Sequence, residues 1–372
     1  MVNNKIINSP KIITLVIFIV MGIITIICIS TLKNRRSWQK DKNQGQVNII
    51  DKKNLLSNTP KNADLSETLY QAWIYPGEPA CNVINEIADG RKVHILKPEY
   101  ATLDSHGALK FINAEEGCNG FSAENLAYLK KHSQEQYMTV SGHLVEMAAF
   151  FSHTSMLSEN IKKLVDFVVT NNMTGVELDF EDFSAWSNID YQNYLKFVAQ
   201  LGQELAKHDK KLMIDGPAIA NSEQQGWYKW KYEDFNSLPV SYIVVMAYDY
   251  QADQGVGQPI SPIKWVEESA KWALAKMTDD SKLVIGLPSY GYEGVLNSYT
   301  ARILTKSQME ALVDLGKLIR DEESKELIGT INNKTYVLND RISLDSKLQI
   351  LRGIGINNVS VWHLGGNDWF SN

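Results

Sequence analysis

Short apolar runs alternate with amphipathic stretches through most of this chain, and this alternation restricts its fold more than any other feature. Runs with the composition of buried strands recur from about residue 67 onwards, with segments of helical periodicity between them. Repeated β-α units favour a parallel sheet, and eight of them fit a (β/α)8 barrel, the TIM barrel, of ordinary size. The eight predicted strands are Gln71–Tyr75, Lys92–Leu96, Gln136–Ser141, Gly175–Phe180, Lys211–Asp215, Tyr242–Tyr248, Leu283–Leu287 and Val359–Trp362.

The segments between these runs contain predicted helices. Glu159–Thr170 and Tyr191–Ala206 carry apolar residues at helical spacing, and Pro262 begins a third helix that runs to about Met277. After the seventh strand, Lys325–Asn339 contains two β-prone runs joined by two asparagines, which predicts an inserted hairpin. The predicted fold class is therefore α/β, a barrel with a small β-hairpin insertion after strand seven.

The predicted fourth strand carries three carboxyl groups on one face. Glu177, Asp179 and Glu181 alternate with apolar residues, and successive strand side chains point to opposite sides. A solvated surface gains nothing from three like charges in a row, whereas a site that holds a proton between carboxyl groups does, because a nearby like charge raises a carboxyl pKa. Glu181 is predicted to be the last inward residue of its strand, where catalytic groups of barrels lie. An ordinary half-buried strand with an acidic exposed face is the alternative.

Further polar and aromatic residues fall at the ends of other predicted strands. Met246 and Tyr248 share a face of the sixth strand, and Asp249 follows at its mouth. A tyrosine hydroxyl there is suited to donate to a substrate amide, although core packing explains a buried tyrosine equally well. Phe183 and Trp186, just after the acidic strand, are candidates to line a cleft.

The acidic strand resembles the signature of glycoside hydrolase family 18, the chitinase-like enzymes, which runs Asp-Gly-x-Asp-x-Asp-x-Glu. Gly175, Asp179 and Glu181 match it, whereas Thr174 and Glu177 stand where the family usually has aspartates. These departures leave the acid and its neighbouring aspartate in place. They affect the inner hydrogen-bond relay, which Glu177 has to serve with a longer side chain.

Other stretches resemble further motifs of the same family. They follow one another in the family's order, mostly at the ends of predicted strands, and they extend the resemblance over residues 67–372. The matching stretches are Ser141-Gly142, Met246–Asp249, Gly286–Gly291, and Ser343–Lys347 with Val361–Gly365.

The resemblance implies a retaining, substrate-assisted glycosidase that cleaves β-1,4 bonds next to N-acetylglucosamine in chitin, chitooligosaccharides or peptidoglycan. Asp179 and Glu181 are two residues apart on one strand and so lie on the same side of the sugar, which does not suit an opposed nucleophile. Glu181 is implied to be the acid, with Asp179 and Tyr248 assisting the substrate's own acetamido group and no metal or other cofactor required. The implied substrate-binding residues are Tyr75, Glu177, Met246, Asp249, Tyr290 and Trp362.

A non-catalytic, chitinase-like lectin on the same barrel is the alternative, since a fold does not imply activity. Family members of that kind typically lose the acid, and Glu181 is present, so the sequence favours an enzyme. Chitin and peptidoglycan both stay open as substrates, because no wall-binding module is evident ahead of the predicted barrel.

Charge and cysteine content limit the partners of this 372-residue chain. Its net charge is −6, without a basic block in the predicted barrel, so nucleic acid is not an expected partner. Three cysteines without a Cys-x-x-Cys give no support to a zinc cluster or redox motif. Cys81 and Cys118 fall in predicted loops after the first two strands, so they are either a disulfide in an oxidising compartment or two free thiols.

An almost entirely apolar segment, Ile12–Ile29, precedes the predicted barrel and is about long enough to span a bilayer. Basic residues between positions 33 and 42 favour a cytoplasmic C-terminal side by the positive-inside rule. The enzyme class instead predicts a single-pass membrane protein with an extracytoplasmic catalytic domain, or a secreted one if the segment is cleaved. The predicted regions are an N-terminal flank (1–11), a transmembrane signal-anchor (12–31), a polar linker (32–66) and the catalytic barrel (67–372).

Overall fold

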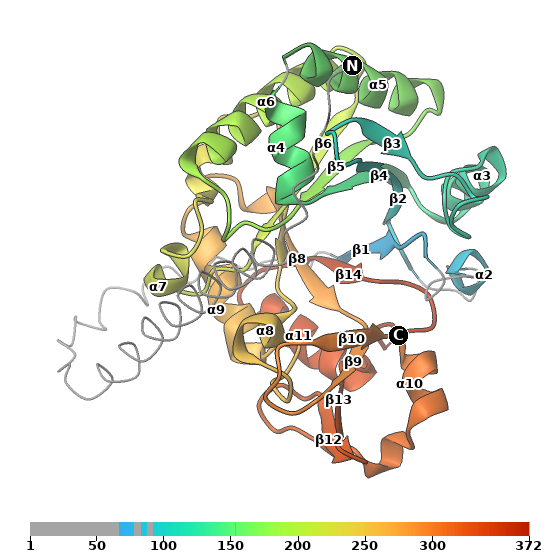
Figure 1. Cartoon of the computed structure of the whole chain (residues 1–372), viewed down its shortest axis with the longest axis vertical. Helices are drawn as coiled ribbons and strands as arrows, with labels where there is room; N and C mark the ends of the chain where they lie inside the picture. The colour runs from blue at the N-terminus through green and yellow to red at the C-terminus, as the bar shows by residue number, and fades with distance from the viewer. Residues whose placement is uncertain (1–66, 78–82, 88–91, 153, 372) are drawn as a thin grey trace, which may run out of the picture. The chain divides into compact units, whose positions relative to one another are not determined.

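Eight parallel strands close into a barrel with helices around the outside (Figure 1). This computed structural model describes residues 67–77, 83–87, 92–152 and 154–371, all within one compact unit, Asp64–Asn372. The last barrel strand pairs with both the seventh and the first, which closes the sheet and confirms the predicted (β/α)8 barrel. The barrel strands are β1 (Leu69–Ile74), β2 (Ile95–Leu103), β4 (Glu135–Gly142), β5 (Gly175–Phe180), β6 (Lys211–Pro217), β7 (Tyr242–Met246), β8 (Leu283–Pro288) and β14 (Asn358–Trp362).

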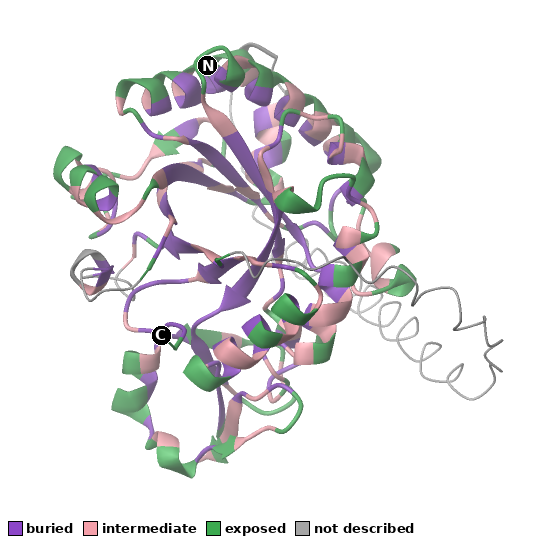
Figure 2. Ribbon diagram, turned by 180° about the vertical axis from the view of Figure 1, so that it is seen from behind, coloured by how far each residue is buried: buried purple, intermediate pink, exposed green. Residues whose placement is uncertain are grey.

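Helices cover the outer face of the barrel, with their buried sides toward the strands (Figure 2). The three predicted helices are present as α5 (Thr154–Thr170), α6 (Asn188–Ala206) and α9 (Ile263–Leu274). The remaining helices are α2 (Val83–Ile87), α3 (Ala123–His132), α4 (Leu144–Ser152), α7 (Ser222–Gln225), α8 (Tyr250–Gln254), α10 (Lys306–Leu312) and α11 (Arg341–Gly353), with 3-10 turns at Tyr232–Phe235, Asp280–Lys282 and Leu315–Lys317.

Side chains fill the barrel interior. Because strand residues alternate, the apolar side chains of β5 pack outwards against helices while its acidic face points inwards. An apolar cluster of Trp73, Ile95, Tyr137, Met213, Val244 and Val284 occupies part of the interior. Polar residues share it: Lys97, Thr139, Glu177 and Asp215 are each exposed by 1% or less. Burial of so many ionisable groups requires that they be paired or neutral.

The second strand differs from its prediction. The sequence predicts Lys92–Leu96, whereas β2 spans Ile95–Leu103 and carries an antiparallel partner, β3 (Leu109–Phe111). Proline lacks an N–H donor and is usually confined to edge strands, strand ends and bulges. In the structure Pro98 lies opposite Ile74, the last residue of β1, where that ladder ends.

The insertion between β8 and β14 is larger than the predicted hairpin. The hairpin itself is confirmed as β12 (Leu327–Ile331) and β13 (Lys334–Leu338), with φ angles of 51° and 63° at Asn332 and Asn333 as its tight turn requires. It belongs to a five-stranded antiparallel sheet in the order β10-β9-β13-β12-β11, seen at the bottom of Figure 1. The added strands are β9 (Gly291–Gly294), β10 (Ala301–Leu304) and β11 (Ile319–Arg320).

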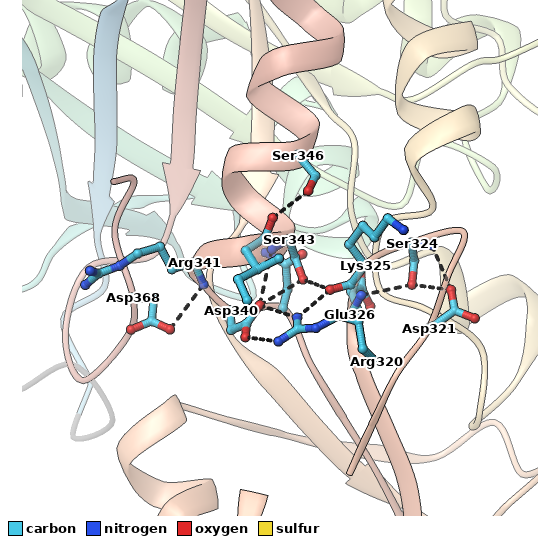
Figure 3. A network of polar contacts seen from close by, with 12 residues as sticks. Arg320, Asp321, Ser324, Lys325, Glu326, Asp340, Arg341, Ser343, Ser346 and Asp368 are labelled. Atoms are coloured by element: carbon cyan, nitrogen blue, oxygen red, sulfur yellow. Dashed lines mark hydrogen bonds and ion pairs between the residues drawn. The ribbon is translucent and has the colours of Figure 1, made fainter. Parts of the chain in front are cut away.

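A polar network attaches this insertion to α11 (Figure 3). Arg320 donates two hydrogen bonds, of 2.6 and 2.7 Å, to the carboxylate of Asp340, which also accepts from the backbone N–H of Ser343 at the start of α11. Glu326 is fully buried, where it accepts from the N–H groups of residues 260 and 261 and lies 3.3 Å from the ammonium group of Lys347. The insertion is therefore fixed to the barrel by buried charges as well as by packing.

The predicted transmembrane segment (12–31) and linker (32–66) lie outside the described residues. Within the part of the chain that is described, no helix has the length and apolar character needed to cross a bilayer.

Candidate active site

Strand β5 carries its acidic residues up the barrel to the C-terminal mouth. In register, Thr139 and Ser141 of β4 lie beside Glu177 and Asp179. Glu181 follows the last strand residue, where its N–H donates to the carbonyl of residue 142 at 2.9 Å and its own carbonyl accepts from the indole N–H of Trp186 at 2.7 Å. The backbone of Glu181 is thus held on both sides, which fixes where its carboxyl group emerges.

Gly175 begins this strand, and its position explains why the motif has glycine there. A Cβ atom on Gly175 would lie 2.0 Å from the carbonyl oxygen of Lys211 on β6. The neighbouring Thr174 uses its side-chain oxygen to accept from the N–H of Gln136 at 3.1 Å. Thr174 therefore ties adjacent strands together at the end of the barrel opposite the mouth.

A cavity of about 270 Å³ opens at the mouth and brings together most of the predicted site residues. Asp179, Glu181 and Tyr248 line it, with Tyr75 and Trp362 as aromatic walls. Its full lining is Tyr75, Glu99, Ser141, Gly142, His143, Asp179, Glu181, Tyr248, Asp249 and Trp362. Such a concave site with convergent acids and aromatic faces suits a sugar ring.

The two carboxyl groups at the mouth are tuned to hold a proton. Burial raises the pKa of Asp179 well above its ordinary value, and the negative charges of Glu181, Glu177 and Glu99 raise it further. The pKa of Glu181 is also raised, first by its enclosure in the cleft and then by neighbouring carboxylates, while His143, 3.8 Å away, opposes the shift. Neighbouring groups of this kind titrate as a coupled pair, with apparent pKa values that belong to the pair.

Tyr248 lies between two tryptophans at the centre of the site. Its ring is stacked on Trp362, with centroids 6.1 Å apart, and meets Trp73 edge-on at 6.3 Å. Gly286 makes room for this packing, since a Cβ there would lie 3.1 Å from Tyr248 and 3.3 Å from Trp73. Burial raises the pKa of Tyr248 well above its ordinary value, so its hydroxyl stays protonated and able to donate.

Asp249 is held in place by a residue that the sequence analysis assigned to substrate contact. The hydroxyl of Tyr290 donates a short hydrogen bond to Asp249, and the side-chain amide of Gln251 donates to the same oxygen at 3.1 Å. Tyr290 is fully buried and lines neither cavity, so the structure does not place it in the direct contact with substrate that was expected. Asp249 itself, exposed at the mouth, lines the cavity as expected.

A second cavity, of about 240 Å³, adjoins the first on the other side of Glu181. Glu181, Tyr248 and Asp249 line both, and Met246 and Phe183 line the second, as the sequence analysis expected of them. Its aromatic lining includes Tyr228, Tyr250 and Trp265. Glu181 therefore stands between two halves of one cleft, which is where a group that protonates a bond between two sugars has to be.

Glu177 does not reach the cleft, which corrects its expected role in substrate binding. Its side chain is fully buried and lies 2.6 Å from the ammonium group of Lys97. Parity along β5 correctly gave the face on which Glu177 lies. It gave no information on depth: Glu177 lies one inward position below Asp179 on β5 and does not line the cavity.

Sequence reasoning missed several polar residues of this region. Glu99 lines the first cavity and accepts from Ser141 at 2.6 Å, and burial raises its pKa. Lys97 and Glu99 share a face of β2, but the predicted strand ended before them. Asp215, predicted only as the end of a strand, is fully buried with both carboxyl oxygens unpartnered among the described atoms, and burial raises its pKa well above the ordinary value.

The described residues include one cysteine of the candidate disulfide and the side chains that could hold a metal ion. Cys118 is disulfide-bonded, whereas Cys81 lies outside the described residues. Among the side chains that the structure describes, no three His, Cys, Asp or Glu residues are grouped so as to hold a metal ion.

Several solved structures share this fold. A chitinase from Chromobacterium violaceum superposes with a TM-score of 0.65 at 19% sequence identity, covering 81% of this chain and 95% of that one. The spore cortex-lytic enzyme SleL of Bacillus cereus gives a TM-score of 0.63 at 16% identity, covering 82% of this chain and 75% of that one. At such identities the likeness shows the fold alone.

Curated relatives are found in Bacillus subtilis. The uncharacterized glycosylase YvbX is 22% identical over 201 residues, which are 51% of this chain and 57% of that protein. The cortical fragment-lytic enzyme is 23% identical over 223 residues, which are 55% of this chain and 50% of that protein. The chain thus spans about half the length of these curated relatives.

An eight-stranded barrel whose cleft holds the carboxyl groups of Asp179 and Glu181 is typical of the glycoside hydrolases. Within that class, the model of glycosyl hydrolases family 18 matches residues 73–368. The chain belongs to this family.

Proposed function

We propose that this protein hydrolyses β-1,4 bonds next to N-acetylglucosamine, with retention of configuration and with the substrate's own acetamido group as nucleophile. The observation that carries the proposal is the meeting of Asp179, Glu181, Tyr248 and Trp362 in one cavity. Asp179 and Glu181 extend from a single strand, so both approach the sugar from the same side. An enzyme-derived nucleophile needs a second carboxyl group on the opposite side of the anomeric carbon.

In this mechanism Glu181 is the general acid and then the general base. Burial and neighbouring carboxylates raise its pKa, which favours the protonated form that can donate to the glycosidic oxygen as the bond breaks. The sugar before the bond lies over Trp362 in the first cavity, and the leaving sugar lies in the second. Once deprotonated, Glu181 takes a proton from the water that completes hydrolysis.

Asp179 and Tyr248 handle the acetamido group. The carbonyl oxygen of that group attacks the anomeric carbon and forms an oxazolinium ion, which carries positive charge. Asp179 accepts a hydrogen bond from the amide N–H and stabilises this charge, while the Tyr248 hydroxyl donates to the acetamido oxygen and orients it. Both groups act more strongly on the charged intermediate than on the substrate, as catalysis requires.

The substrate class that we propose is an N-acetylglucosamine glycan, either chitooligosaccharide or peptidoglycan. Chitinases and a spore cortex-lytic enzyme among the structural neighbours support both members of this class. A single experiment separates them: the product profiles of the wild type on chitooligosaccharides and on purified peptidoglycan. Hydrolysis should require an N-acetyl group on the sugar at the cleavage site, so a fully deacetylated oligomer should bind and scarcely react.

Retention should be visible by NMR, with the β-anomer appearing first. A thiazoline mimic of the oxazolinium ion should inhibit competitively, and Asp179→Asn should weaken that inhibition. Equal cleavage of acetylated and deacetylated oligomers, or a trapped covalent glycosyl-enzyme, would exclude substrate assistance. Tight binding without turnover on every glycan would instead identify a chitinase-like lectin.

A further inference from the structure

A buried ion pair lies directly under the carboxyl pair of the cleft. The ammonium group of Lys97 on β2 is 2.6 Å from one carboxyl oxygen of Glu177 on β5, and both side chains are fully buried. The hydroxyl of Thr139, on the strand between them, donates to the other oxygen of Glu177. Hydrogen bonds therefore occupy both oxygens of Glu177, and neither of these bonds comes from Asp179.

Burial and the neighbouring groups act on the charge of Lys97 in opposite directions. Its nitrogen lies 3.1 Å from the centroid of the Trp73 ring, a geometry in which the ring face attracts a cation. Burial lowers the pKa of Lys97, but the carboxyl groups of Glu177, Asp215 and Asp179 oppose that shift. A buried pair of this kind contributes little net stability because both ions lose their hydration. Its placement under the cleft therefore calls for a role in the site.

The pair controls the field at Asp179. One oxygen of Asp179 has no hydrogen-bond partner among the described residues, so Asp179 is not tied to the residue below it. The negative charge of Glu177 raises the pKa of Asp179 more than the positive charge of Lys97 lowers it. The other ionisable groups near Asp179 and Glu181 are Glu99 on β2, His143 after β4, Asp182 after β5, Asp215 on β6, and Tyr248 and Asp249 after β7.

We infer that Lys97 is a positioning residue for the reaction: it holds the carboxyl group of Glu177 toward β2 and away from Asp179, so the catalytic proton stays between Asp179 and Glu181. This inference rests on the proposed function and adds to it the group that places the proton. It also accounts for Glu177 in the family motif, because the longer side chain reaches past β4 to a cation on β2.

The test replaces the ion pair by a neutral pair of the same shape. Lys97→Met alone leaves Glu177 buried without its cation, and Glu177→Gln alone leaves Lys97 without its anion, so both should lower the unfolding midpoint strongly. The double variant Lys97→Met/Glu177→Gln removes both charges and should recover that midpoint to within about 3 °C of the wild type. The double variant therefore separates loss of stability from loss of the field.

The measurement is the pH profile of kcat/KM on a fluorogenic chitooligosaccharide. Without the field of Glu177, the pKa of Asp179 falls, so the double variant should lose its catalytic proton at lower pH. The alkaline limb should move down by about one pH unit, which is a tenfold loss of kcat/KM above the wild-type limb. A double variant whose profile superimposes on that of the wild type would show that the pair is only structural.

A second buried pair provides the matched control. Glu326 and Lys347 are also fully buried and 3.3 Å apart, but they join the insertion to α11 and line neither cavity. Lys347→Met/Glu326→Gln should leave the alkaline limb where the wild type has it. An equal shift in this control would assign the effect to destabilisation and overturn the inference.

A readout without turnover keeps the inference separate from the proposed function. Carbon-13 NMR titration of the carboxyl groups, assigned with Asp179→Asn and Glu181→Gln, should place the highest pKa of the pair about one unit lower in the double variant. Unchanged carboxyl titration would overturn the inference even in an active enzyme. A wild type that hydrolyses no glycan would overturn the proposed function, while the titration would still decide the role of Lys97.

Discussion

Glu181 has the most exposed carboxyl group of the acidic strand, with 46% of its side chain accessible, and it is shared by both cavities. Glu181→Gln keeps its size and removes its proton. We expect kcat to fall by about 10²- to 10⁴-fold, the usual contribution of a general acid, with oligosaccharide affinity nearly unchanged. Discontinuous activity assays would measure kcat, and isothermal titration calorimetry would measure the oligosaccharide affinity. Glu204→Gln, on the outer helix α6 and paired with Lys207, serves as the control and should keep full activity. A near-normal kcat of Glu181→Gln would show that Glu181 is not the general acid.

The buried carboxyl group of Asp215 should make the stability of the protein depend on pH, because burial and Glu177 raise its pKa in the folded state. A carboxyl group with a raised folded pKa stabilises the protein below its unfolded pKa of about 3.9, and that contribution is lost as pH rises toward the folded value. The wild type should therefore lose stability relative to Asp215→Asn by up to about 1.4 kcal/mol per pH unit as the pH rises above the unfolded pKa of the aspartate. Urea unfolding at several pH values measures this difference, and a difference independent of pH would contradict it.

At the level of residues, the sequence predicted which side chains face the cleft better than how deep they lie. Alternation placed Glu177, Asp179 and Glu181 on one face, and the structure agrees. Depth depends on the side chains of neighbouring strands. The sequence analysis therefore assigned Glu177 to substrate binding, although the structure buries it below the cavity. Lys97 was missed because the predicted strand ended at Leu96, one residue before it.

At the level of elements, the insertion depends on a charge pair at the start of α11. Asp340 is both the partner of Arg320 and the N-cap that accepts from the Ser343 N–H (Figure 3). Burial alone would raise the pKa of Asp340, but Arg320 and Ser343 outweigh burial and hold it below its ordinary value. A lowered folded pKa gives stability that is present above the unfolded pKa and lost as pH falls through the folded one.

Two substitutions separate these roles of Asp340. Asp340→Asn keeps a good N-cap and loses the charge pair, so it should cost about 1.5–3 kcal/mol at neutral pH and progressively less as pH falls below about 4. Asp340→Ala also loses the cap and should cost about 1 kcal/mol more. Chemical unfolding of the three proteins at pH 7 and pH 3 provides the comparison. An Asp340→Asn deficit of equal size at both values would show that charge does not stabilise this joint.

The same insertion shows which elements sequence patterns predict. The strands β12 and β13 are five residues each with two asparagines between them, so their pattern was readable. The strands β9, β10 and β11 are four residues or fewer, too short for alternation to stand out, and they form only because the hairpin offers an edge for pairing. Most of the barrel strands were predictable because they are buried on both faces and contain apolar runs, whereas β5 was recognised by its alternation.

At the level of the whole molecule, the main proposal concerns the compartment in which the barrel lies. We propose that residues 12–31 anchor the protein in a membrane with residues 67–372 outside the cytoplasm. Two observations support a barrel outside the cytoplasm. The proposed substrate, an N-acetylglucosamine glycan, is a wall or extracellular polymer. Cys118 is disulfide-bonded, as is usual in oxidising compartments. The basic residues at 33–42 oppose it, since they favour a cytoplasmic C-terminal side.

Protease accessibility decides between these opposing signals. The polar stretch 32–66 is the predicted linker, so protease added to intact cells or spheroplasts should cut there and release a soluble fragment that contains the barrel. The released fragment should keep its activity, because the site lies entirely within residues 75–362. A cytoplasmic protein marker in the same sample should stay uncut and so prove that the membrane is intact. Digestion only after lysis would place the barrel in the cytoplasm and show that the basic flank, not the enzyme class, sets the orientation.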